Sequence, residues 1–264
     1  MGGGNNDGND QSYGPRLDGR LIPQFDSPVV NGVRQATPWI AHPDNVSSFF
    51  NTGNTFTNNI SFSGGTEKAQ ARVSIGDENT QGYIPNNTFH KFSSSLNGNL
   101  NVSSRFTVGA SVQYTDNSAK NRPGVGYNTG ILEQFVWFGR QVDMSELKAK
   151  QYNADGSLYN WNLNYHNNPY FLQYDNPQSD QRDRYIASVQ ASWKLSNWLN
   201  AQLRSGSDIY RYTINEDNAA GNINYTDLAY NGAMYQFNNN NNENNTELLF
   251  AANGHAGKHF QLNA

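Results

Sequence analysis

The chain has 264 residues, and its 18 Lys and Arg against 22 Asp and Glu give a formal net charge of −4. Because nucleic-acid binding needs a basic footprint, nucleic acid is not an expected partner. Cysteine is absent, which excludes disulfide scaffolds, thiolate metal sites and cysteine nucleophiles. Aromatic residues make up 13% of the chain, more than is typical of disordered proteins. The 41 Asn and 24 Gly indicate an all-β protein with large polar loops.

No segment has the roughly 18 consecutive apolar residues of a transmembrane helix, and the first residues lack the basic and apolar regions of an export signal. Residues 1–53 show no sustained period and are rich in Gly, Asn, Asp and Pro, so an irregular segment is expected there. From residue 54 onward, apolar and polar residues alternate with a period of two, which is typical of half-buried strands. The pattern predicts eight strands, over 54–63, 69–75, 92–100, 106–115, 185–195, 199–209, 246–252 and from 260 onward.

The connections between these strands alternate in length. The short ones are 64–68, 101–105, 196–197 and 254–258. The long ones are 77–87, 117–183 and 211–231. In an up-and-down antiparallel sheet this places all short turns at one rim and all long loops at the other, as in outer-membrane barrels. Within the longest loop, residues 131–150 have a helical pattern, with Glu146 four residues before Lys150.

Aromatic residues gather at the ends of the predicted strands, as in the two aromatic girdles of a membrane barrel. The residues expected in these girdles are Phe62, Phe106, Tyr114, Tyr185, Trp193, Trp198 and Tyr210. The predicted fold class is therefore all-β, an antiparallel transmembrane β-barrel segment of about eight strands with long extracellular loops. A soluble β-sandwich or barrel remains open, because its strands alternate equally well around an apolar interior.

Ten aromatic residues lie within the forty residues 135–174 of the longest loop. Aromatic rings beside Asn and Asp side chains suit stacking on a sugar or a peptide. Most of these rings are expected to pack within the loop, which a loop of this length needs. Trp161, Tyr165 and Tyr170 are the preferred ligand contacts. Changing Trp161 to Ala is expected to weaken ligand capture while the barrel stays folded.

The sequence contains no convincing catalytic or metal-binding pattern. His255 and His259 have the spacing of metal ligands, but the glycines around them argue against a helix that would present both rings together. No nucleophile elbow and no dinucleotide loop is present in the sequence. We therefore expect no metal, no cofactor and no catalytic residue.

Several ordered segments resemble the SusC/RagA type of TonB-dependent outer-membrane receptor. They are Gly14-Pro15-Arg16-Leu17-Asp18-Gly19, Phe49-Phe50-Asn51-Thr52-Gly53, Asn58-Asn59-Ile60-Ser61-Phe62-Ser63-Gly64-Gly65, Asn121-Arg122-Pro123-Gly124, Trp137-Phe138-Gly139-Arg140-Gln141-Val142-Asp143 and Gly206-Ser207-Asp208-Ile209-Tyr210. Each segment alone is a weak signal, but their order and spacing run over nearly the whole chain.

The resemblance implies a barrel of about 22 strands around an N-terminal plug. The chain would then be an internal fragment that lacks the plug and the signal peptide, with residues 1–53 extracellular and residues 54–264 in the barrel. The implied function is import of oligosaccharides or peptides across the cell outer membrane, with a SusD-like surface lipoprotein as partner and energy from TonB, contacted through the missing N-terminal part. Outer-membrane lipid would surround the wall, and the protein would not be an enzyme.

The alternative from another class is a soluble, secreted, β-rich carbohydrate-binding module or glycosidase domain. A glycosidase needs two carboxylates across a cleft, roughly 5 to 9.5 Å apart, and no such pair stands out in the sequence. A passive porin or adhesin barrel would explain the alternation but not the ordered segments. Exposure of the apolar strand face distinguishes the readings, because a soluble module hides that face inside.

Overall fold

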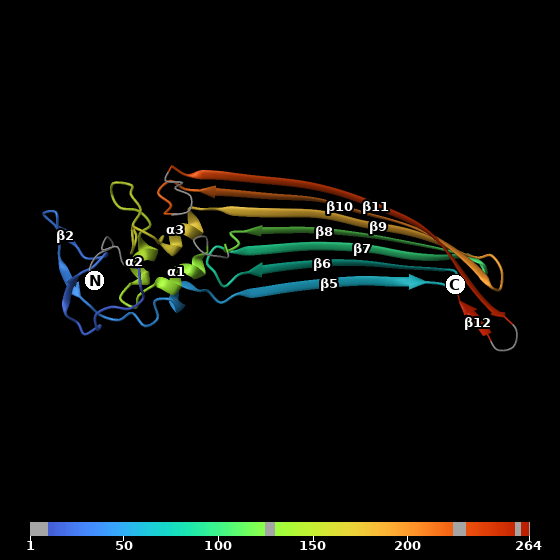
Figure 1. The fold of residues 1–264 in the computed structure, drawn as a ribbon, viewed down its shortest axis with the longest axis horizontal. Helices are drawn as coiled ribbons and strands as arrows, with labels where there is room; N and C mark the ends of the chain where they lie inside the picture. The colour runs from blue at the N-terminus through green and yellow to red at the C-terminus, as the bar shows by residue number, and fades with distance from the viewer. Residues whose placement is uncertain (1–9, 125–129, 224–230, 257–259, 264) are drawn as a thin grey trace.

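A computed structural model describes residues 10–124, 130–223, 231–256 and 260–263. Eight strands form one antiparallel sheet in which every strand pairs with its neighbours in the chain (Figure 1). The strands are β5 (Asn54–Gly65), β6 (Ala69–Gln81), β7 (Thr88–Ser103), β8 (Phe106–Lys120), β9 (Gln178–Lys194), β10 (Leu199–Asn218), β11 (Ala233–Ala256) and β12 (Phe260–Asn263). The predicted all-β, up-and-down antiparallel sheet is confirmed.

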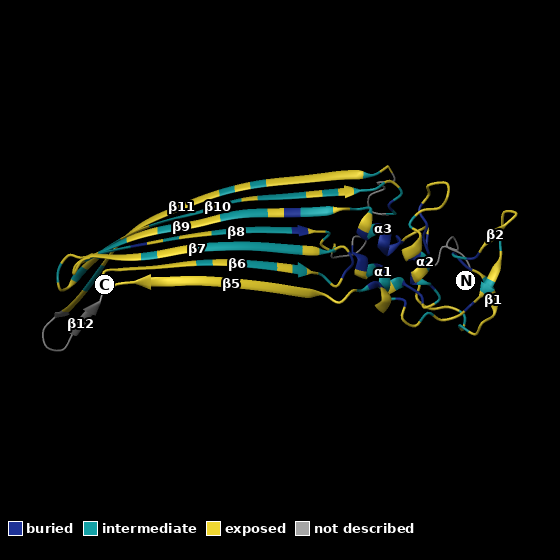
Figure 2. Cartoon of the chain, turned by 180° about the vertical axis from the view of Figure 1, so that it is seen from behind, coloured by how far each residue is buried: buried dark blue, intermediate teal, exposed yellow. Residues whose placement is uncertain are grey.

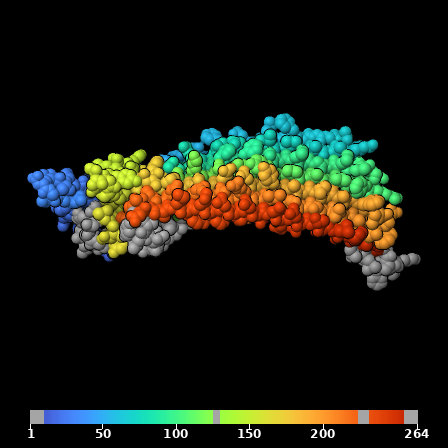
Figure 3. All heavy atoms as spheres, turned by 90° about the horizontal axis from the view of Figure 1, so that it is seen from above, coloured from blue at the N-terminus to red at the C-terminus, as the bar shows by residue number. Residues whose placement is uncertain are grey.

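The connections alternate as the sequence predicts. Residues 66–68, 104–105 and 195–198 turn at one end of the sheet, and the long connections 82–87, 121–177 and 219–232 join the strands at the other end (Figure 1). In the space-filling view the strands build one continuous, curved wall (Figure 3). The sheet therefore has a plain rim of tight turns and an elaborate rim of loops.

Most strands extend further toward the loop rim than the alternation predicts. β10 has 20 residues and β11 has 24, and they pair without interruption from Leu199↔Ala252 to Asn218↔Ala233. The longest loop consequently begins after Lys120 and ends before Gln178. The alternation pattern does not detect these outer parts, because consecutive polar residues there occupy both faces of a strand. An example is the Asn run 238–242 of β11, which pairs with residues 209–213 of β10.

Residues 1–53 contain short pieces of regular structure among irregular backbone. Two small hairpins pair β1 (Leu21–Pro23) with β4 (Ala36–Pro38) and β2 (Val29–Val30) with β3 (Val33–Arg34), and η1 (Ser47–Phe49) is a single 3₁₀ turn. Strands of two or three residues cannot be predicted from periodicity, which needs several alternating residues.

The longest loop contains three short helices, α1 (Ile131–Trp137), α2 (Met144–Ala149) and α3 (Pro169–Tyr174). The helix predicted within 131–150 is thus two helices. At α2, Asp143 caps the first turn by accepting from the backbone N–H of Ser145, and the Glu146 carboxylate lies 3.7 Å from the Lys150 amine. None of the described helices is long and apolar enough to cross a membrane.

The hydrophobic core lies outside the sheet. We call the assembly of residues 24–53, 82–87 and 130–177 at the loop rim the cap. Its core side chains are Phe25, Phe49, Ile84, Ile131, Phe138, Val142, Met144, Leu147, Tyr159, Trp161 and Tyr170. Within β5 to β12, Ala119 is the one buried hydrophobic residue among those whose burial is described. Figure 2 shows this contrast, with buried positions concentrated in the cap and exposed or half-buried positions along the strands.

Candidate functional site

The register divides the residues of the sheet between two faces, because paired residues on neighbouring strands point the same way. Val112 pairs with Leu96 on one side and Ala187 on the other, and Leu96 pairs with Val73. We call the face that carries these residues the apolar face. Its further apolar members include Phe62, Ile60, Ile75, Leu100, Val108, Val189, Leu203, Leu248 and Phe250. The opposite face, with Ser111 and Ser188, is the polar face.

The apolar face is open. Val112 is 46% exposed and Leu248 is 61% exposed, although both lie in the middle of long strands. The apolar band on β8 extends from Phe106 to Tyr114, which is about 26 Å along the strand at 3.3 Å per residue and roughly 20 Å in height at a strand tilt of about 40°. Membrane barrels carry an outward apolar band of about 25 Å. A continuous exposed apolar surface of this size marks an interaction with another apolar phase.

Aromatic rings lie at both ends of this band. Near the short turns, the Phe106 and Trp193 ring centroids are 6.1 Å apart, and Phe62 lies near the end of β5. Toward the loop rim, the Tyr114 and Tyr185 ring centroids are 4.6 Å apart. Five of the seven residues expected in the girdles thus lie on the apolar face.

The other two expected girdle residues are placed differently. Tyr210 pairs with Arg184 and lies on the polar face, since its neighbour Ile209 occupies the apolar face. The prediction that Tyr210 belongs to the girdle on the apolar face is therefore wrong. Trp198 lies in the 195–198 turn before β10 and is 57% exposed.

The polar face carries hydroxyl, amide and charged side chains. The Arg184 guanidinium donates to both carboxylate oxygens of Asp208, with Nε to Oδ1 at 2.8 Å, and Arg204 pairs with Glu247 on the next strand. The Arg182 guanidinium lies 4.6 Å from the centroid of the Tyr210 ring. The two ion pairs balance their charges within the face, which suits a wet interior or contact with another polar surface.

The cap holds the three aromatic residues predicted to contact ligand. Trp161 is 7% exposed and packs edge-on against Phe138 at 5.1 Å, and Tyr170 is 3% exposed and packs against Phe49 at 5.1 Å. Neither ring offers a free face to a ligand in this conformation. Tyr165 is 41% exposed and is the one of the three that a ligand or partner could reach.

Buried polar side chains hold the cap together. The Asn168 amide donates to the backbone carbonyls of Leu147, Lys150 and Tyr159, and its side-chain oxygen accepts from the N–H of Tyr170 at the start of α3. Sequence reasoning missed this residue. The Asn-Asn-Pro at 167–169 was the available signal, since Asn as N-cap followed by Pro at the first helical position marks a helix start.

Asn167 ties the cap to the β10–β11 loop. Its amide donates to the Ile223 carbonyl at 2.7 Å and its oxygen accepts from the Ile223 N–H at 2.8 Å. The Asn167 side chain thus makes the same two hydrogen bonds with Ile223 that a residue of a neighbouring β-strand would make through its backbone. A second tie joins the β6–β7 loop to the end of β8, where the Asn87 amide donates to the carbonyls of Lys120 and Asn121.

His166 is the most enclosed ionisable side chain of the cap. Its ring stacks on Trp161 at 5.0 Å, and its nitrogens lie 3.2 Å from Gln134 Oε1 and 3.1 Å from Asp10 Oδ2. Burial lowers the pKa of His166 below its usual value, while Asp10 and Glu133 oppose that shift. The neutral ring is therefore favoured in the folded cap.

Within the residues that the structure describes, no group of three or more His, Cys, Asp or Glu could hold a metal ion. His259 and the side chain of His255 lie outside the described residues. The arrangement thus presents two extended surfaces and a packed cap as the features that function can use.

Among the solved structures that match this arrangement are three of RagAB. Structures of the RagAB peptide importer in the closed-closed and open-open states match with TM-scores of 0.59 at 17% and 18% identity. A structure of the RagAB peptide transporter matches with a TM-score of 0.57 at 18% identity. The matches cover 80% to 83% of this chain but only 23% to 24% of those chains.

No family model matches the sequence, and no curated protein matches it. The likeness to the RagAB structures is therefore a likeness of backbone fold, at 17% to 18% sequence identity. The chain has the fold of a segment, about a quarter in length, of the RagAB chains, as the resemblance of its sequence to SusC/RagA receptors implies.

Proposed function

We propose that this chain forms part of the wall and extracellular loops of a TonB-dependent importer in the outer membrane. The apolar face of β5 to β11 contacts lipid, the polar face lines the lumen, and the cap lies outside the cell. The observation that carries the proposal is the exposed apolar band with aromatic rings at both ends. The likeness to the RagAB structures supports the same assignment.

The imported substrate is proposed to be a peptide or an oligosaccharide, delivered by a SusD-like lipoprotein, with energy supplied through TonB. The peptide importer named in the matching structures favours the peptide. The chain itself breaks no bond in this scheme. Of the three aromatic residues predicted to contact ligand, Tyr165 is the one exposed enough to contact substrate or lipoprotein.

The soluble module is disfavoured by the same surface. In a soluble sandwich or barrel the apolar strand face is the interior, covered by a second layer. Among the described residues, no element packs over the apolar face at Val112, Leu203 or Leu248, all of which are at least 46% exposed. Lipid is the environment that satisfies such a surface.

The absence of cysteine from these 264 residues allows a direct test by site-specific labelling, once any cysteine elsewhere in the full-length protein has been changed to Ser. A single Cys is introduced at Val112 or, as the matched control on the opposite face, at Ser111. Each variant of the full-length protein carries a spin label and is studied in lipid bilayers. We expect the label at 112 to collide with oxygen, which partitions into lipid, and the label at 111 to collide more with a water-soluble nickel reagent.

The reverse pattern, or low accessibility of the label at 112 to both reagents, would contradict the proposal. Low accessibility to both reagents is the result expected of a soluble module with this face buried. Adjacent residues on one strand share backbone environment and strand stability. The difference between the two labels therefore reports the face alone.

A further inference from the structure

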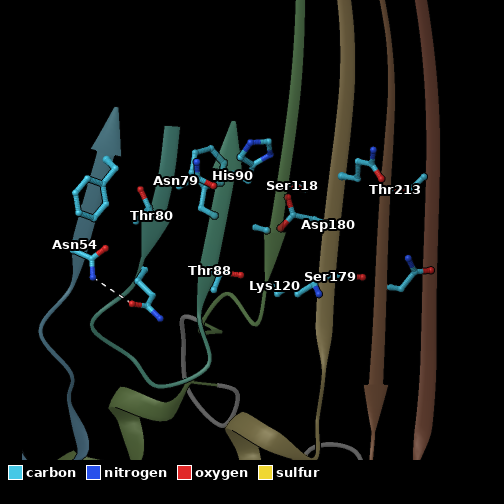
Figure 4. Close-up of a pocket in the computed structure, with 16 residues that line it drawn as sticks. Asn54, Asn79, Thr80, Thr88, His90, Ser118, Lys120, Ser179, Asp180 and Thr213 are labelled. Atoms are coloured by element: carbon cyan, nitrogen blue, oxygen red, sulfur yellow. Dashed lines mark hydrogen bonds between the residues drawn. The ribbon is translucent and has the colours of Figure 1, made fainter. Parts of the chain in front are cut away.

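The apolar face changes character beyond the outer aromatic rings. There a hollow of about 560 Å³ spans the six strands from β5 to β10, close to where they enter the cap (Figure 4). Ser118 and Lys120 line it and follow Tyr114 on β8 at two-residue steps, so the hollow lies on the same face as the apolar band. It is therefore outside the wall and separate from the lumen.

The lining has the chemistry that binds sugars. An exposed phenyl ring, that of Phe56, lies at the β5 end of the hollow beside the Asn79 amide, and further amide and hydroxyl groups such as Gln181 and Thr213 follow on β9 and β10 toward the other end. Amides and hydroxyls both donate to and accept from sugar hydroxyl groups, and an aromatic ring covers the apolar side of a pyranose. Lys120 and His90 add cationic or polar groups at the edge.

The height of the hollow above the aromatic rings determines which kind of lipid head group can reach it. Ser118 and Lys120 lie four and six residues beyond Tyr114, roughly 13 to 20 Å along the strand. With a strand tilt of about 40°, this is roughly 10 to 15 Å above the outer aromatic rings. The head-group layer of an ordinary bilayer adds only about 5 to 8 Å on each side of the hydrocarbon. A phospholipid head group is too short to fill the hollow.

We infer that the hollow binds the oligosaccharide head group of a glycolipid in the outer leaflet, held beside the wall by its acyl chains on the apolar band. The inference rests on the proposed membrane orientation. The hollow and the band lie on one face, separated by the single row of side chains that holds Asp77, Asp116 and Asp183. This arrangement favours a lipid-anchored sugar over a free one, because both parts of one molecule can then be bound on one face. A free imported glycan would instead be recognised on the polar face.

Binding is measured with the full-length protein in nanodiscs and three probes. These are a lipooligosaccharide, the lipid A from it without core sugars, and the soluble core oligosaccharide without acyl chains. We expect the lipooligosaccharide to bind more tightly than either part. Changing Phe56 to Ala is expected to weaken that binding about tenfold, the value of one lost ring contact.

Thr57→Ala is the matched control, because Thr57 neighbours Phe56 in β5 and points to the other face. Thr213→Val, a nearly isosteric change, keeps the test valid should Phe56→Ala fold poorly, and it is also expected to weaken binding. Unchanged binding in both Phe56→Ala and Thr213→Val overturns the site. Equal binding of lipid A overturns the role of sugar, and equal binding of the free oligosaccharide overturns the lipid anchor.

Failure of this inference is distinguishable from failure of the proposed function. If the label at 112 contacts lipid but the hollow variants bind normally, only the glycolipid site falls. If the label at 112 does not contact lipid, the orientation falls and the glycolipid site falls with it.

Discussion

The sheet and the cap obtain their stability in opposite ways. The cap buries Phe49, Leu147 and Phe171 almost completely within its own residues, whereas the sheet leaves Val112 and Leu248 about half exposed. The strands are held by continuous backbone pairing, and their half-exposed apolar side chains gain the rest of their burial only when another phase covers them. A mutation in the cap therefore tests internal packing, and a mutation on the apolar face tests the surroundings.

The variant with the largest expected effect on the packing of the cap is Trp161→Ala. Removing a buried Trp is expected to cost the cap about 3 to 5 kcal/mol, since its contacts with Phe138 and His166 are lost. Hydrogen exchange of the cap amides measures the loss. Tyr165→Ala, at an exposed neighbour, is the control and is expected to cost about 1 kcal/mol or less.

The same variant separates packing from ligand contact at Trp161. Weaker ligand capture with unchanged exchange protection in the cap would restore the direct ligand role predicted from the sequence. Weaker capture together with loss of protection would show that Trp161 acts through the fold of the cap.

The corresponding change in the sheet is Val112→Arg. A cation at Val112, midway between the centre of the apolar band at Ala110 and its outer end at Tyr114, is expected to destabilise the barrel by about 2 to 3 kcal/mol on the side proposed to face lipid. Reversible unfolding of the full-length protein from lipid vesicles measures this cost. Ser111→Arg on the polar face is expected to change stability little, and equal costs at 111 and 112 would contradict the assignment of the two faces.

A smaller effect is expected for Asn168→Ala. This change leaves three carbonyls and one N–H without their side-chain partner, at a cost of about 2 kcal/mol to the cap. Limited proteolysis within 130–177 should become faster. Asn164→Ala, at an exposed position of the same segment, should leave the cleavage rate unchanged. Similar rates for both variants would show that the buried amide does not hold the cap.

The smallest expected effect is a pH dependence from His166. Its pKa is lowered in the folded cap, so its contribution to stability is present above the unfolded pKa near 6.5 and is lost as pH falls through the folded pKa. Hydrogen exchange of cap amides, corrected for intrinsic rates, should show less protection near pH 5 than near pH 7.5. His166→Gln should remove the difference, and persistence of the difference in that variant would assign it to other groups.

The sheet was predictable because its signal is local. The alternation from Phe106 to Tyr114 fixes strand and face together, and the same rule, applied strictly, already excludes Tyr210 from the face of Ile209. The outer parts of β10 and β11 were not predictable from alternation, since the Asn run 238–242 gives no apolar face to detect. The continuous pairing of β10 with β11 reveals them.

The cap was predictable only as a region rich in aromatic residues. Whether a ring is buried depends on residues far away in the chain, as with Tyr170 against Phe49 or Phe135 against Phe50. Composition could place the cluster but not rank its members by exposure. Trp161 and Tyr170, which were preferred as ligand contacts, are buried in the cap, as was expected of the other rings of the cluster.

The ties made by Asn87, Asn167 and Asn168 have a consequence for how such a protein can diverge. Each of these amides contacts main-chain atoms of its partner segment, which are the same for every amino acid except proline at the N–H. The partner segments are free to exchange their side chains while the connections persist. A protein built this way can change the side chains of its loops under selection and keep the loops in place with a few asparagines.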